Sequence, residues 1–134
     1  MEIKSLNDHI DVLIVEDEVD ICYLLTGILK KKNLQTSYVG TIAEADKALN
    51  RQKPTILFID NHLPDGFGLD FIQKVKKDHP STRIVMITAH DTTEDKQKAR
   101  QEGVDIFISK PFTQQTINRT IDLLVKDLQI ISLK

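Results

Sequence analysis

Short apolar runs alternate with segments of helical periodicity along the 134 residues of this chain. The runs are mostly rich in Val and Ile, and the third and fourth are apolar at every position, which is typical of strands covered on both faces. They span residues 10–15, 34–39, 56–59, 84–87 and 104–108. We predict five strands, with the second and weakest one at an edge of the sheet.

After each run, apolar residues recur at the spacing of an α-helix. The residues that mark the five helices are Ile21, Leu24, Leu25 and Ile28; Ile42, Ala45 and Leu49; Leu69, Ile72 and Val75; Ala99 alone in 91–102; and Ile117, Ile121, Leu124 and Leu128. Asn33 follows three lysines and fits a left-handed cap, while Thr41 and Glu44 form a capping-box pattern. This fivefold alternation predicts a parallel sheet with helices on both faces.

Composition sets limits on the class of protein. The length fits one domain with a sizeable core, and a net charge of −2 gives no nucleic-acid footprint. The single cysteine, Cys22, excludes an internal disulfide and suits a reducing compartment. The N-terminus is unlike a signal peptide, and no apolar run is long enough to span a bilayer. We therefore expect a cytoplasmic protein whose partners include neither membrane nor nucleic acid.

Polar residues of reactive types stand where four of the predicted strands end. In open parallel sheets, ligands bind beyond the carboxyl ends of the strands. The residues at these ends are Glu16 and Asp17, Asp60, Thr88, and Ser109 with Lys110. Each one alone is better explained as a helix-starting acid, a strand terminator or a surface charge. Together they supply three carboxylates, a hydroxyl and an ammonium, so we predict that they form one site.

Three neighbouring carboxylates repel one another unless a cation neutralises them. An all-oxygen set favours Mg²⁺, since Ca²⁺ would require a dense acidic loop and a transition metal would require clustered His or Cys. A phosphoryl group, unlike a metal alone, also needs an adjacent ammonium, because its oxygens bear more charge than Mg²⁺ can cover. Asp60, at the end of an apolar strand, is therefore a candidate phosphate acceptor.

The chain resembles a response-regulator receiver domain, the phospho-acceptor module of two-component signalling. The resemblance rests on VLIVEDE (12–18), ILFIDNHLPDGFGLDFI (56–72), IVMITAH (84–90) and GVDIFISKPF (103–112). It implies a single domain over residues 1–134, with a core from about 10 to 128, a short N-terminal extension and a C-terminal tail. It also implies a flavodoxin-like (βα)5 fold, a doubly wound sheet of five parallel strands in the order 2-1-3-4-5.

The resemblance assigns a role to each acid of the predicted site. Asp60 corresponds to the phosphorylated aspartate, and Asp17 to the acid that binds Mg²⁺ directly. Glu16 corresponds to the acid that reaches the metal through water, at a position where many receivers have aspartate. His62 lies at the position whose backbone carbonyl ligates the metal.

Other roles concern the response to phosphorylation. Thr88 corresponds to the switch hydroxyl and Phe107 to the switch aromatic. Lys110 corresponds to the lysine that contacts the phosphoryl group, and its peptide bond to Pro111 is expected to be cis.

Two histidines stand beside these positions. His62 and His90 come two residues after the predicted acceptor and the predicted switch hydroxyl. The resemblance implies that side chains at these variable positions flank the phosphoryl group and tune the rate of dephosphorylation. Chance surface histidines are the alternative explanation.

The resemblance implies that the donor is a phosphohistidine of a sensor histidine kinase or a histidine phosphotransferase. The chain would be no enzyme, although it would support its own phosphotransfer and autodephosphorylation. Its output partner would be a separate protein or a domain of a longer regulator, and phosphorylation would be able to join two copies. A rival function is an Mg²⁺-dependent aspartyl-phosphate phosphatase. Such enzymes usually place a second acid two residues after the nucleophile, where this chain has His62.

Overall fold

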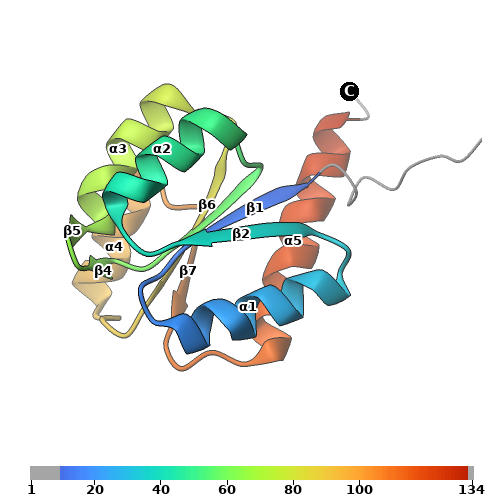
Figure 1. Cartoon of the computed structure of the whole chain (residues 1–134), viewed down its shortest axis with the longest axis horizontal. Coiled ribbons are helices and arrows are strands. Elements are labelled where there is room, and N and C mark those ends of the chain that lie inside the picture. The colour runs from blue at the N-terminus through green and yellow to red at the C-terminus, as the bar shows by residue number, and fades with distance from the viewer. Residues whose placement is uncertain (1–9, 133–134) are drawn as a thin grey trace, which may run out of the picture.

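The computed structural model describes the backbone of residues 10–132 and the side chains of residues 10–128. Its main sheet consists of five parallel strands in the order β2-β1-β3-β6-β7 (Figure 1). These strands are β1 (Asp11–Val15), β2 (Gln35–Val39), β3 (Ile56–Ile59), β6 (Arg83–Thr88) and β7 (Ile106–Ser109). Counted among themselves, they follow the order 2-1-3-4-5, so the predicted topology is confirmed, and β2 does lie at an edge.

Helices cover both faces of the sheet (Figure 1). They are α1 (Val19–Lys31), α2 (Ile42–Gln52), α3 (Gly68–Asp78), α4 (Thr93–Glu102) and α5 (Gln114–Ser132). α1 and α5 pack on one face, whereas α2, α3 and α4 pack on the other. Among the described residues, none of these helices combines the length and the hydropathy that crossing a bilayer requires.

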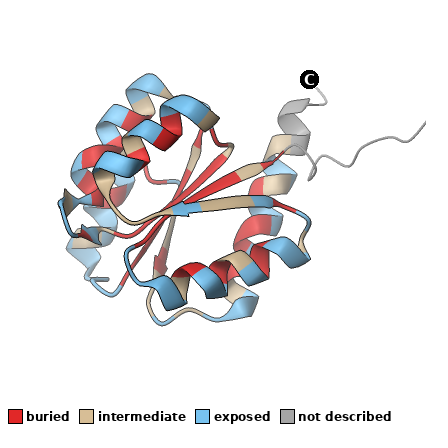
Figure 2. Cartoon of the chain, viewed as in Figure 1, coloured by how far each residue is buried: buried red, intermediate tan, exposed pale blue. Residues whose placement is uncertain are grey.

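Alternate residues of the central strands pack into two separate cores. In β1, Val12 and Ile14 face α1 and α5, while Leu13 and Val15 face the opposite layer. All four side chains are buried, because β1 lies inside the sheet and is covered on both faces (Figure 2). A residue at the end of such a strand is therefore held in place by the close packing of the residues before it.

Helix termini follow the predicted signals. The hydroxyl of Thr41 accepts a hydrogen bond from the backbone N–H of Glu44 at 3.1 Å, and Asn33 adopts the left-handed region after α1 with φ of 63°. The segment with Ala99 as its one apolar anchor does form α4, and Ala99 is buried.

One of the apolar residues that mark α1 in the sequence is not buried. Leu24 is 52% exposed. Each residue turns an α-helix by about 100°, so Leu24 does not share the face of Leu25. The buried face of α1 is instead completed by Cys22 and Leu29.

A small hairpin between β3 and α3 was not predicted. β4 (His62–Leu63) pairs antiparallel with β5 (Gly66–Phe67). Two-residue strands are too short to show the alternation that identifies a strand in a sequence. The hairpin leads from the end of β3 to the first turn of α3, where Gly68 comes so close that a Cβ would lie 2.5 Å from the carbonyl oxygen of Asp60.

Candidate functional site

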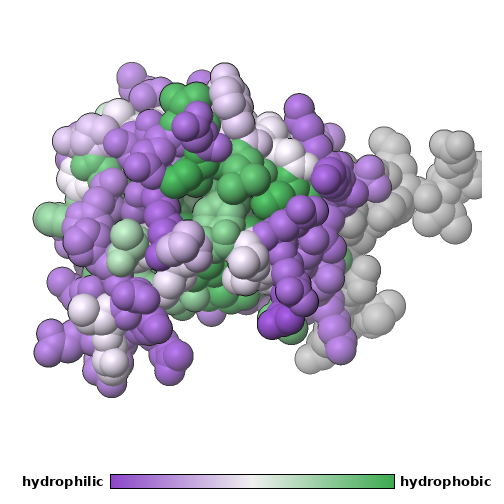
Figure 3. Space-filling model, turned by 90° about the horizontal axis from the view of Figure 1, so that it is seen from below, coloured by the Kyte–Doolittle hydropathy of each residue, from purple (hydrophilic) through white to green (hydrophobic). Residues whose placement is uncertain are grey.

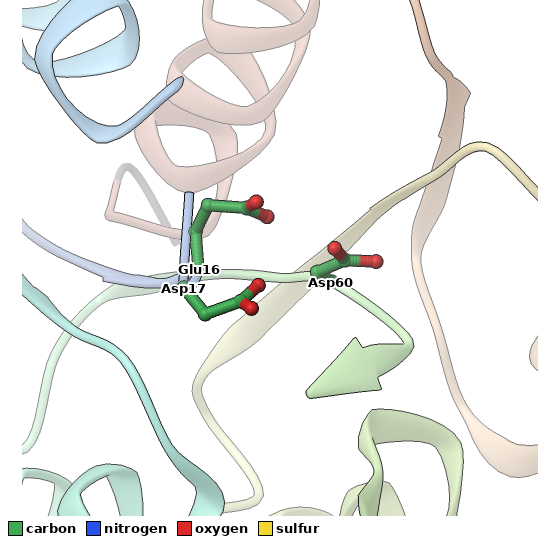
Figure 4. A group of neighbouring side chains, drawn as sticks. All are labelled: Glu16, Asp17 and Asp60. Atoms are coloured by element: carbon green, nitrogen blue, oxygen red, sulfur yellow. The ribbon is translucent and has the colours of Figure 1, made fainter. Parts of the chain in front are cut away.

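The carboxyl edge of the sheet brings together the three acids singled out in the sequence. β1 and β3 are paired neighbours with Val15 opposite Ile59, so Glu16 and Asp60 leave the sheet side by side. Asp17 points toward the same region (Figure 4). Carboxylate oxygens of the three residues lie within 4.8 Å of one another. These residues, named here the acid cluster, are contributed by two strands that lie 44 residues apart in the chain, at positions 16 and 60.

Two of the three carboxylates are removed from solvent. Glu16 is 4% exposed and Asp60 7%, whereas Asp17 is exposed. Burial, followed by the charge of Asp60, raises the pKa of Glu16 to about 7. The surroundings of the cluster therefore do not fully stabilise its negative charge, and a cation that binds there lowers the free energy of the ionised acids.

The ammonium of Lys110 lies among these acids. Its Nζ contacts both carboxylate oxygens of Glu16, at 3.1 and 3.2 Å, and Oδ2 of Asp60, at 3.0 Å. Burial opposes the charge of Lys110, but hydrogen bonding and attraction to Asp60, with a contribution from Glu16, raise its pKa. One ammonium offsets one of the cluster's negative charges and leaves the others for a metal ion. The peptide bond from Lys110 to Pro111 is cis.

The predicted switch residues lie on the next two strands. Thr88 ends β6 with only 1% exposure, and its carbonyl accepts a hydrogen bond from the backbone N–H of Lys110 at 2.9 Å. Phe107 on β7 is half-buried against the core under α2, α3 and α4. It also lines a groove beside α4 together with Ala99 and Arg100.

His62 and His90 are both exposed and lie against each other. Their ring centroids are 3.8 Å apart with the planes tilted by 36°. Their backbones are arranged alike, since the N–H of His62 donates to Oδ1 of Asp60 at 3.2 Å and the N–H of His90 donates to Oγ1 of Thr88 at 3.3 Å. The structure therefore brings the start of β4 into contact with the segment that follows β6.

Oxygen ligands on a rigid edge fit a hard divalent cation. The acid cluster provides three carboxylates and no nitrogen or sulfur ligand, which is the chemistry that Mg²⁺ prefers. A metal ion could therefore bind to Glu16, Asp17 and Asp60.

Three further residues support the site and were not assigned to it from the sequence. Glu18 contacts Nζ of Lys110 at 3.4 Å, and Oδ1 of Asn61 accepts from the backbone N–H of Leu69 at 2.9 Å, at the start of α3. Sγ of Cys22 donates to the carbonyl oxygen of Glu16 at 3.3 Å. Burial, followed by the charge of Glu16, raises the pKa of Cys22 to about 11, so this thiol stays protonated and acts in packing.

A family model for the response regulator receiver domain matches residues 12–129. The chain belongs to this family. It is 37% identical over 99 residues to the response regulator protein PilR of Pseudomonas aeruginosa, a match that covers 74% of this chain and 22% of PilR. The receiver domain of a LuxO repressor from Vibrio parahaemolyticus superimposes with a TM-score of 0.86 at 25% identity, covering 92% of this chain and 95% of that one. The beryllofluoride-activated NtrC4 receiver domain dimer gives 0.83 at 29% identity, over 87% and 97% of the two chains.

The protein is thus a receiver domain of the two-component response regulators, as the sequence predicted. The chain spans 22% of PilR, and 46% of the transcriptional regulatory protein TcrX of Mycobacterium tuberculosis, to which it is 29% identical over 81% of its own length. The relatives are therefore considerably longer proteins than this chain.

Proposed function

We propose that this receiver accepts a phosphoryl group on Asp60 in a reaction that depends on Mg²⁺. One observation supports this above all: buried Asp60 meets two further carboxylates and the ammonium of Lys110 at one edge of the sheet. A purely structural ion pair would need one acid, not three. A nucleophile that attacks a phosphorus atom needs both the metal and the ammonium.

The donor in this proposal is a phosphohistidine of a sensor histidine kinase or a histidine phosphotransferase. A carboxylate oxygen of Asp60 forms a bond to phosphorus as the bond from phosphorus to the imidazole nitrogen breaks, and the electron pair returns to the imidazole. When bound by Glu16, Asp17, Asp60 and the carbonyl of His62, Mg²⁺ supplies positive charge to the phosphoryl oxygens. Lys110 neutralises a further oxygen and, because it already touches Asp60, has only a short distance to move.

Thr88 and Phe107 form the switch in this proposal. The hydroxyl of Thr88 moves to a phosphoryl oxygen, and Phe107 fills the space that Thr88 leaves. The phosphorylated protein then favours a conformation that exists before phosphorylation, with α4, β7 and α5 as the surface that partners read. The beryllofluoride-activated NtrC4 receiver is a dimer, and we propose a homodimer for the phosphorylated form of this chain too.

Exposed apolar side chains on α1 suit contact with the partner that delivers phosphate. Val19, Tyr23 and Leu24 of α1 are 53%, 62% and 52% exposed. Figure 3, seen from the side on which α1 lies in Figure 1, shows apolar surface framed by hydrophilic side chains. Such patches are typical of protein–protein contact sites. We place the kinase or phosphotransferase on this face, in the cytoplasm.

The test is labelling by acetyl phosphate with Mg²⁺, read as the mass of the intact protein and of its peptides. We expect one phosphoryl group on Asp60, loss of labelling in EDTA, and no labelling of Asp60→Asn. Asp70→Asn, which removes an exposed acid on α3, is the matched control and should label normally. Full labelling of Asp60→Asn would refute the proposal, and sustained turnover of small phosphate esters would favour the phosphatase.

A further inference from the structure

The hairpin β4–β5 is tied to the start of α2 by Asp65. Its two carboxylate oxygens accept hydrogen bonds from the backbone N–H groups of Ile42 and Ala43, at 2.9 and 3.0 Å. Both amides belong to the first turn of α2, where backbone N–H groups have no partner within the helix. The hydrogen bonds from Ile42 and Ala43 also lower the pKa of Asp65, so its side chain is a carboxylate at neutral pH.

The tip of the hairpin also packs against α2. Gly66 has a φ of 150°, which disfavours residues with a side chain, and a Cβ there would lie 3.2 Å from Cδ1 of Ile42. Figure 1 shows β4 and β5 at the same end of the molecule as the start of α2. The hairpin is therefore held against α2 by hydrogen bonds and by close packing.

The other end of the hairpin reaches the acid cluster. His62 opens β4 two residues after Asp60, and its backbone N–H donates to Oδ1 of Asp60 at 3.2 Å. His62 pairs with Phe67 across the hairpin, and Leu63 pairs with Gly66 next to Asp65. Because the two strands are so short, only the pair formed by Leu63 and Gly66 separates the backbone of His62 from the tip of the hairpin.

We propose that Asp65 is a positioning residue for the metal ion: it fixes the hairpin on α2 and thereby holds the backbone carbonyl of His62 ready to bind Mg²⁺. The inference rests on the proposed function, in which that carbonyl is a ligand. In a protein without Asp65, the carbonyl has to be ordered as the ion binds, and the affinity for Mg²⁺ falls accordingly.

A matched pair of variants separates positioning from simple helix capping. Asp65→Ala removes the tie between hairpin and helix, whereas Thr41→Ala removes a cap on the same helix end, since the hydroxyl of Thr41 bonds within α2 to Glu44. The measurements are thermal unfolding in EDTA and Mg²⁺ titration followed by backbone amide chemical shifts. Both variants should melt lower by a few degrees, about 4 °C. Only Asp65→Ala should bind Mg²⁺ more weakly, by about tenfold.

Asp65→Asn keeps one acceptor oxygen, so its Mg²⁺ affinity should lie between those of wild type and Asp65→Ala. If Asp65→Ala does not fold, the affinity of Asp65→Asn decides the question. Wild-type Mg²⁺ affinity in the Asp65 variants, or an equal loss in Thr41→Ala, would overturn this inference while the proposed function stands. A wild-type protein that does not bind Mg²⁺ would instead overturn the proposed function and this inference with it.

Discussion

Replacing Glu16 by glutamine should stabilise the protein in EDTA at alkaline pH. The side chain is 4% exposed, and burial together with the charge of Asp60 raises its pKa from an ordinary 4.5 to about 7. A shift of this size corresponds to about 3 kcal/mol of free energy that the folded protein loses when Glu16 ionises. Glutamine is nearly the same size but carries no charge. The NH₂ group of glutamine replaces one of the two oxygens that accept hydrogen bonds from Lys110, and the loss of that bond offsets part of the benefit. We therefore expect the free energy of unfolding to rise by about 1 to 3 kcal/mol.

The pH dependence identifies the cause. Because the folded pKa of Glu16 is higher than the unfolded one, the wild-type protein loses stability as the pH rises from 4.5 to about 7, and the loss is complete above that. The advantage of Glu16→Gln should therefore be less than about 1 kcal/mol near pH 5 and reach its full size near pH 8. Saturating Mg²⁺ should reduce the advantage at pH 8, because the cation stabilises the wild-type acid cluster more than the variant.

Urea denaturation in EDTA at both pH values measures these differences. Glu18→Gln is the matched control, since Glu18 also contacts Lys110, at 3.4 Å, but its side chain is 61% exposed. Its effect should stay within about 0.5 kcal/mol at both pH values. The reasoning is refuted if Glu16→Gln is less stable than wild type at pH 8, or if its gain is equal at the two pH values.

Three other predictions follow from the same geometry. Asp17→Asn should melt no lower than wild type in EDTA, because it removes a repulsive charge, but it should lose most of the stabilisation that Mg²⁺ gives, because it also removes a ligand. A lower melting temperature in EDTA together with a wild-type response to Mg²⁺ would contradict this. Replacing both His62 and His90 by alanine should change the dephosphorylation rate at least several-fold between pH 6 and 8, which corresponds to about 1 kcal/mol in the activation barrier. An unchanged rate would show that the two histidines are ordinary surface residues. Gly68→Ala should lower the free energy of unfolding in urea by about 1 to 3 kcal/mol, because its Cβ would lie 2.5 Å from a backbone oxygen. The control Gly27→Ala, within α1 and with nothing within 4 Å of its Cβ, should be neutral or stabilising.

The fold was predictable because its signals are local. Each central strand is a run of buried apolar residues, and Asn33 after α1 and Thr41 before α2 act on residues only a few positions away. Leu24 shows the limit of apolar spacing as a signal, because a helix face can be completed by Cys22 while a leucine beside it stays in solvent.

Within the site, the sequence predicts which residues come together but not which side chains touch. The carboxyl ends of parallel strands meet at one edge, so topology alone brings Glu16, Asp17 and Asp60 together. The contact between Lys110 and Glu16 joins residues 94 positions apart, and the contact between the two imidazoles joins β4 to the segment after β6. Those contacts depend on side-chain conformations and loop paths for which the sequence has no local signal.

Asp60 was found because it breaks an ordinary rule of protein structure. A carboxylate that ends a buried strand is costly, and a function explains Asp60 better than chance does once the reactive residues at the other strand ends are considered with it. Asp65 was missed because it breaks no rule: an acid in a polar turn is ordinary, and its helix partners lie 22 and 23 positions earlier in the chain. An acid that breaks a local rule, as Asp60 does, is therefore visible in a sequence. An acid that satisfies every local preference, as Asp65 does, is not, even though its hydrogen bonds join two elements that are distant in the chain.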